Sequence, residues 1–232
     1  MNPLPLPYTL HSDDTVALLL LGCFLLSAYI LSRSRKFLYL LVKDFLLNRE
    51  RNSIFATSTS ADMRYLLLLV VQTCVLAALL LYACLCGSVA QEVAGRVPTL
   101  LAVGLLTGVL MLALALKWAV YSLAGWVFFG SARTSLWLES YSTLLYYAGF
   151  VLYPVVLFAV YFGWSVQSVA VFGGIVAVLF KLMIFYKWQQ LFCYNLHGCL
   201  LLILYFCALE IVPCLMLYRG VVQLTHYLII NI

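Results

Sequence analysis

Charged side chains are scarce in this sequence of 232 residues. Only 9% of the residues are Asp, Glu, Lys or Arg, whereas 66% are hydrophobic. A soluble domain carries about 25% charged residues, and a much smaller share cannot cover a surface that faces water. The composition therefore excludes an ordinary soluble domain and predicts that most of the exterior faces lipid.

The sequence also lacks the patterns that mark metal sites and enzyme active sites. Its eight cysteines include no C-x-x-C pair, and no His stands at ligand spacing from them. Cysteine inside an apolar run is typically a small buried hydrophobe, so neither disulfides nor a zinc site are expected. No cluster of His, Asp and Ser marks one interface, as a lipid-modifying enzyme would need. We predict no catalytic, cofactor-binding or metal-binding residues, and no cofactor.

Long apolar runs dominate what is present. A spanning helix needs about 20 apolar residues to cross about 30 Å of hydrocarbon, and only helices and closed barrels satisfy their own backbone in lipid. The alternation with period two that marks a barrel strand is absent. The sequence therefore predicts an all-α, polytopic membrane helix bundle with about six transmembrane helices, forming a single membrane domain over residues 1–232. The predicted spans are 15–32, 65–86, 99–128, 144–162, 169–187 and 198–218.

Basic residues collect in one segment, the loop over residues 33–64. Seven of the thirteen Lys and Arg residues lie there. Lysine and arginine accumulate on the cytoplasmic side of membrane proteins, so this loop is predicted to be cytoplasmic and both termini to lie on the opposite side. The net charge of +5 does not indicate nucleic-acid binding, because so much of it is confined to this loop.

Three ionisable residues fall inside the predicted spans, where an unpaired charge costs several kcal/mol. Counted at 1.5 Å per residue from the cytoplasmic end of each span, Lys181 lies ~9 Å deep, Lys117 ~14 Å and Glu210 ~18 Å. The long side chain of Lys181 can reach the interface, whereas that of Glu210 cannot. Pro213 removes the helical hydrogen bond to the carbonyl of Leu209 and bends the sixth span beside Glu210. The three ionisable residues and this proline form the candidate intramembrane polar site: Lys117, Lys181, Glu210 and Pro213.

The similar depths of Lys117 and Glu210 lead to a specific hypothesis, that the third and sixth spans meet through a Lys117–Glu210 pair. Two roles stay open for this pair: it could fix which helices meet, or it could titrate protons or bind a substrate. Arg133 and Glu139, in the short loop between the third and fourth spans, are expected to make local surface contacts. Trp137 is expected to belong to an aromatic belt near the span ends.

Small residues mark surfaces where helices can approach closely. Gly104 and Gly108 form a GxxxG pattern on the third span. Such patterns let two helix backbones come together, either within one bundle or between chains. We therefore expect contacts with the lipid bilayer, and a membrane-protein partner or a homo-oligomer stays open as an alternative.

The last third of the chain contains two distinctive stretches, the run from Lys181 to Lys187 and the Cys-x-Leu-Glu-Ile-x-Pro segment from Cys207 to Pro213. In these stretches it resembles a family of integral membrane proteins from Bacteroidota, described as domain of unknown function 4271. The stretch from Lys117 to Phe128 is similar to the family's lysine-containing helix. The resemblance implies a bacterial inner membrane location, and the distribution of Lys and Arg then predicts a multi-pass protein with both termini in the periplasm. It implies no activity.

Two functions from different classes remain open. The first is a non-enzymatic inner-membrane subunit or scaffold of a cell-envelope assembly, favoured by the short loops and packing glycines. The second is a small transporter or proton-coupled channel that uses Glu210 and Lys117. A water-filled cavity at Glu210 would favour transport, whereas a dry, paired Glu210 would count against it.

Overall fold

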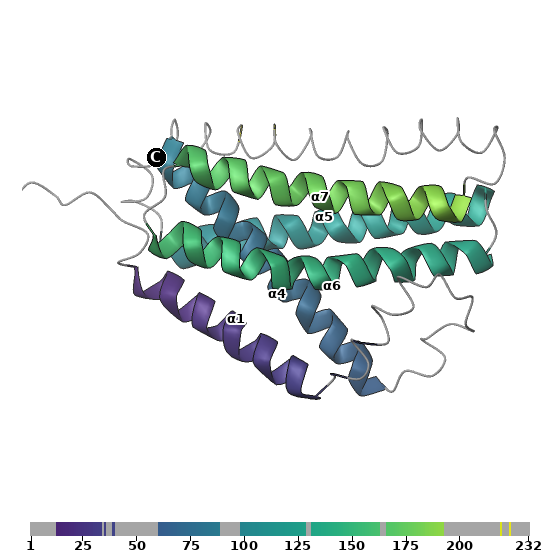
Figure 1. Ribbon diagram of the computed structural model, residues 1–232, viewed down its shortest axis with the longest axis horizontal. Coiled ribbons are helices and arrows are strands. Elements are labelled where there is room, and N and C mark those ends of the chain that lie inside the picture. The colour runs from purple at the N-terminus through teal and green to yellow at the C-terminus, as the bar shows by residue number, and fades with distance from the viewer. Residues whose placement is uncertain are drawn as a thin grey trace, which may run out of the picture.

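The computed structural model describes residues 13–33, 60–88, 98–128, 131–162 and 166–192, together with single positions at 35, 39, 219 and 223. Its elements are helices throughout these ranges: α1 (Asp14–Arg33), α4 (Ser60–Ser88), α5 (Thr99–Phe128), α6 (Ser131–Tyr161) and α7 (Val166–Phe192). They form an elongated bundle in which α6 runs alongside both α5 and α7 (Figure 1). The prediction of an all-α fold is confirmed.

All five described helices are long and apolar enough to cross a membrane, which makes the chain a multi-pass membrane protein. They overlie the first five predicted spans. The sixth predicted span, residues 198–218, lies outside the described residues, so the described count is five where the sequence predicts about six. Most of the basic loop over residues 33–64 lies outside them as well.

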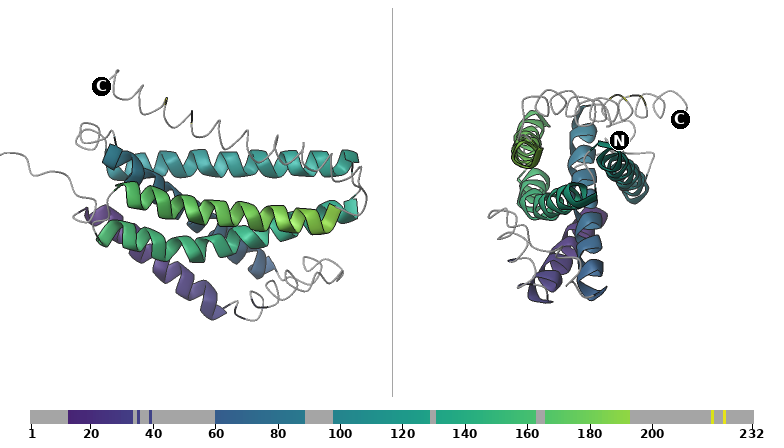
Figure 2. Two further views of the ribbon diagram at one scale, coloured as in Figure 1. Left: turned by 45° about the horizontal axis from the view of Figure 1, so that its top comes forward. Right: turned by 90° about the vertical axis from the view of Figure 1, so that its right-hand side faces the viewer.

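Helix α4 is the centre of the bundle. It contacts α1, α5, α6 and α7, and its contact with α6 is the most extensive in the described chain. The end-on view shows α4 in the middle with the other helices around it (Figure 2). Half of its apolar span is buried, whereas α5 and α7 bury only about a tenth of theirs. The outer helices therefore present apolar surface outward, as lipid contact requires.

Two clusters of buried residues hold α4 in place. The larger one joins α1, α4, α5 and α6 through residues that include Val16, Leu76, Leu79, Val103 and Val156. The smaller one joins α1, α4 and α6 closer to the other end of α1, around Ile30, Leu66, Leu69 and Tyr146. Because lipid is as apolar as these side chains, close packing rather than hydrophobic transfer stabilises such contacts.

Helix α6 begins earlier than the fourth predicted span. It starts at Ser131 rather than near Leu144, and only residues 129 and 130 separate it from the described part of α5. The polar residues at its start lower the local hydropathy, so the sequence suggested a loop. In the structure this segment continues as helix because Trp137 and Tyr141 pack against Tyr121 of α5.

Asp13 ties the start of α1 to the start of α5. Its Oδ1 accepts a hydrogen bond from the backbone N–H of Thr15 at 3.0 Å, which caps α1. Its Oδ2 accepts one from the hydroxyl of Thr99, the first residue of α5, at 2.5 Å. One carboxylate therefore satisfies a helix terminus and fixes the neighbouring helix beside it.

We expect Asp13→Ala to lower the stability of the protein by about 1–2 kcal/mol, because it removes a helix cap and an interhelical hydrogen bond. The matched control is Asp14→Ala, which removes an exposed carboxylate from the next position. Thermal unfolding in mild detergent would measure both variants. Equal midpoints for the two would show that the Asp13 contacts contribute nothing.

Candidate functional site

Lys117 of α5 lies against two tyrosine rings. Its ammonium nitrogen is 5.7 Å from the ring centre of Tyr121, one turn further along α5, and 5.3 Å from that of Tyr141 on α6. At such distances the negative face of an aromatic ring attracts a cation by about 0.5–2 kcal/mol. The structure thus places a candidate residue predicted from the sequence at the α5–α6 contact, with its charge directed at aromatic faces.

The two tyrosines form a compact aromatic cluster with Trp137 of α6. Tyr121 stands edge-on to both neighbours, with ring centres 5.6 Å from Trp137 and 5.5 Å from Tyr141. Trp137 and Tyr141 are 6.2 Å apart. All three are almost fully buried, so Trp137 is an interior residue rather than a member of an outward-facing belt.

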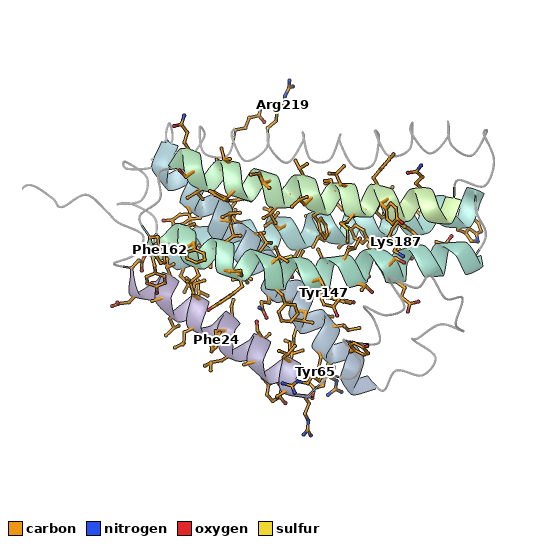
Figure 3. All side chains as sticks on the ribbon, viewed as in Figure 1. Phe24, Tyr65, Tyr147, Phe162, Lys187 and Arg219 are labelled. Carbon is orange, nitrogen blue, oxygen red and sulfur yellow. The ribbon has the colours of Figure 1, made fainter. Side chains whose placement is uncertain are left out.

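The helix register places two more charged residues at the level of this cluster. Lys187 lies about 21 residues, or ~32 Å, into α7, and Glu139 lies about 22 residues, or ~33 Å, before the end of α6. The two helices are antiparallel neighbours joined by a short connection, so equal path lengths put the two residues at one height. Lys187 is only 3% exposed. Figure 3 shows it on the side of α7 that faces α6.

We call the six residues at this level the charged aromatic cluster: Lys117, Tyr121, Trp137, Glu139, Tyr141 and Lys187. These residues lie on α5, α6 and α7, towards the end of the bundle that carries the α5–α6 connection. One oxygen of Glu139, Oε1, is shielded from solvent. Charges near a buried interior are costly unless neighbouring groups compensate them.

A second polar contact lies between α1 and α4. Gln72 of α4 is 4% exposed, and its Nε2 donates a hydrogen bond to the hydroxyl of Ser27 at 2.5 Å. The Ser27 hydroxyl in turn donates to the carbonyl of Cys23 at 2.8 Å. Next to Gln72, the Thr73 hydroxyl lies 2.8 Å from the Leu69 carbonyl and 3.3 Å from the carbonyl of Leu145 on α6. These bonds join α4 to helices on both sides.

The remaining residues of the predicted site are not brought together in the described structure. Lys181 is half-buried on α7, nearly two turns before Lys187. Glu210 and Pro213 lie outside the described residues, so the Lys117–Glu210 pair stays a prediction. Among the described residues, no group of three His, Cys, Asp or Glu side chains is arranged to hold a metal ion. Cys23 and Cys74 are buried thiols.

Comparison with known sequences identifies the family. The model described as Domain of unknown function (DUF4271) matches residues 16–221 of the chain. The chain belongs to the DUF4271 family. This confirms the family that the sequence resembles. No curated protein and no solved structure matches the chain.

In this DUF4271 chain, the candidate site predicted from the sequence does not include Glu139 or Lys187. Glu139 is expected in a loop together with Arg133, and Lys187 is the last residue of the fifth predicted span. The structure places Glu139 in α6 and Lys187 in α7, each near one end of an apolar span. Counting residues from the short α6–α7 connection could have placed them at a similar height, provided that α6 was known to extend back to Ser131.

A double-mutant cycle tests the contact between Lys117 and Tyr141. We expect Tyr141→Leu to destabilise the protein more in the wild-type background than in a Lys117→Met background, with a coupling of about 0.5–2 kcal/mol from the lost cation–π attraction. Tyr141→Phe keeps the ring and should show little coupling. Additive effects of Tyr141→Leu and Lys117→Met on detergent unfolding would contradict the contact.

Proposed function

We propose that this chain is a non-enzymatic inner-membrane subunit or scaffold of a cell-envelope assembly in a Bacteroidota cell. The proposal rests on one observation: polar side chains in the described spans make contacts between helices. Gln72 bonds to Ser27, Thr73 lies against the Leu145 carbonyl, and Lys117 lies against Tyr141, so each links two helices of the same chain. Polar groups used in this way hold helices in fixed positions, as a structural subunit requires.

The outward faces of α5 and α7 support an assembly role. Most of the apolar residues on these helices are exposed, and Gly104 and Gly108 of α5 have no neighbouring atoms that an added Cβ would meet within 4 Å. Such a face lets another spanning helix approach closely. In a monomer, lipid would cover this outward face of α5 and α7 equally well. An experiment must therefore measure the association of chains directly.

The proposed orientation puts the basic end of the bundle in the cytoplasm and both termini in the periplasm. Arg33 ends α1, Arg64 begins the apolar span of α4, and Lys187 ends that of α7. Asp13 and Asp14 lie at the other end of α1. This distribution follows the enrichment of Lys and Arg on the cytoplasmic side. Labelling of single cysteines introduced at positions 2 and 230 in intact cells, in a cysteine-free background, would test the orientation.

Native co-purification tests the subunit proposal directly. The full chain carrying an affinity tag would be extracted from its own membranes after brief cross-linking, and the complex weighed by native mass spectrometry. We expect a second chain, or a second copy, in a fixed ratio. The control is an unrelated multi-pass protein with the same tag and expression level. Recovery of monomer alone, under conditions that keep other envelope complexes intact, would overturn the proposal.

The second candidate is a small transporter or proton-coupled channel that uses Glu210 and Lys117. Lys117 favours it, because an ionisable residue inside a spanning segment is a functional hypothesis in its own right. Reconstituted vesicles with an imposed proton gradient and an enclosed pH-sensitive dye would detect the activity. The candidate predicts gradient loss that Glu210→Gln and Lys117→Met abolish. Gradient loss that neither substitution changes would exclude a role for these residues.

A further inference from the structure

The end of α1 and the start of the apolar span of α4 meet through two tyrosines. The rings of Tyr29 on α1 and Tyr65 on α4 lie edge-on to each other, with their centres 6.0 Å apart. Figure 3 shows Tyr65 beside the end of α1. Next to this contact, Ile30 of α1 packs in one buried cluster with Leu66 and Leu69 of α4. Packed side chains therefore hold the two helix ends in a fixed relation.

One arginine lies beside each tyrosine. Arg33 is four residues after Tyr29 and therefore lies one turn further along the same face of α1. Arg64 directly precedes Tyr65 on α4. Both arginines are exposed, and each is the terminal residue of its apolar span, where hydrocarbon meets water. The packed helix ends therefore place two guanidinium groups at the same membrane boundary.

Exposed apolar side chains continue from the tyrosine contact into the span of α1. Leu18, Leu21 and Leu25 precede Tyr29 at intervals of three or four residues, and all four of these side chains are more than half exposed. Residues at such intervals lie on one face of a helix. They form an apolar stripe on α1 that ends, at the membrane boundary, in Arg33.

The chemistry of this surface matches an anionic phospholipid. A guanidinium group binds a phosphate through two parallel N–H···O bonds, whereas a lysine ammonium acts as a point charge. A tyrosine at the level of the headgroups has a hydroxyl that can donate a further hydrogen bond. The carboxylates described at α1, Asp13 and Asp14, lie at its opposite end, so the charge that the described side chains of α1 place at this boundary is positive.

We propose that Arg33 and Arg64 bind the phosphate of one anionic phospholipid through their guanidinium groups, with Tyr29 beside the headgroup. An acyl chain of the same molecule lies along the apolar stripe on α1. The enrichment of Lys and Arg on the cytoplasmic side depends only on their number, whereas this site requires these two arginines at these positions. The inference is independent of the assembly proposal, because one protein molecule supplies every residue of the site.

Lipid titration of the full-length protein tests the site. The protein would be freed of bound lipid in a neutral detergent, titrated with phosphatidylglycerol or with phosphatidylcholine of the same acyl chains, and analysed by native mass spectrometry. We expect the first phosphatidylglycerol to bind about tenfold more tightly than phosphatidylcholine, and Arg64→Gln to weaken its binding about tenfold. Equal affinities of the two lipids for the wild-type protein would overturn the proposal.

Arg35→Gln is the matched control for Arg64→Gln. It removes the same charge from an exposed position two residues beyond Arg33 and leaves both proposed phosphate ligands in place. We expect it to change the affinity for phosphatidylglycerol by less than about twofold, because a charge outside the site acts only through screened attraction. Equal weakening by Arg35→Gln and Arg64→Gln would indicate diffuse attraction to anionic lipid and would exclude the site.

Two further measurements decide the remaining outcomes. If Arg64→Gln does not accumulate, the double variant Arg33→Lys with Arg64→Lys keeps both charges and the topology signal. A loss of affinity for phosphatidylglycerol then supports the guanidinium contacts, and unchanged affinity contradicts them. Inorganic phosphate serves as a competitor, and we expect it to displace no phosphatidylglycerol at equal concentration because it has no acyl chain. Displacement would assign the site to free phosphate instead of lipid.

Discussion

Leu76→Ala is expected to destabilise the protein by about 2–5 kcal/mol, because it opens a cavity where four helices meet. Leu76 has no exposed surface and belongs to the cluster that joins α1, α4, α5 and α6. Its neighbours lie on rigid helices that cannot collapse into the space. The transfer of a side chain from lipid to the protein interior changes its free energy little. Most of the expected loss of stability therefore comes from lost packing contacts. Reversible unfolding in mixed detergent and SDS would measure it.

Leu67→Ala is the matched control for this prediction. Leu67 lies on the same helix and loses the same atoms, but 63% of its surface is exposed. Lipid or detergent can fill the space that its side chain leaves, so we expect a loss within about 0.5 kcal/mol, as for other exposed sites. Equal losses for Leu67→Ala and Leu76→Ala would show that α4 is not the packed centre of the bundle.

Apolar runs predict the helices of this fold well, because a chain in lipid has few alternatives to the helix. The start of α6 shows where this signal fails. The residues from Ser131 to Glu139 include Arg133, and their hydropathy alone does not distinguish a polar helix end from a loop. Helix continues there because Trp137 packs against Tyr121, a contact between residues of two different helices.

The candidate site is harder to predict than the helices, since it depends on which helices meet. From the sequence, Lys117 is predicted to be costly to place in a span and to pair with Glu210, and that pair stays a prediction because Glu210 lies outside the described residues. In the structure two tyrosine rings lie against the ammonium group of Lys117. Uniformly apolar helices carry almost no information about rotation or neighbours, so neither these rings nor the Gln72–Ser27 contact could be derived from periodicity.

The second large effect is expected at Gly149, where α6 packs directly against Thr73 of α4. A Cβ added at Gly149 would lie 2.5 Å from Oγ1 of Thr73, and Thr73 is itself buried. Two packed helices cannot separate locally, so we expect Gly149→Ala to cost about 1–3 kcal/mol through overpacking. Gly108→Ala is the control, because nothing lies within 4 Å of its added Cβ. That variant should be neutral or slightly stabilising, since alanine favours the helix over glycine.

The clash at Gly149 has a specific remedy. Thr73→Ala removes the Oγ1 atom, after which the nearest atoms of residue 73 lie 3.5 and 3.7 Å from the added Cβ, an ordinary contact distance. Thr73→Ala alone should lose a little stability, because its hydroxyl bonds to Leu69 and reaches the Leu145 carbonyl. The double variant should therefore be more stable than Gly149→Ala, with a favourable coupling of about 1 kcal/mol or more. A double variant less stable than Gly149→Ala would mean that α4 and α6 do not meet at these two residues.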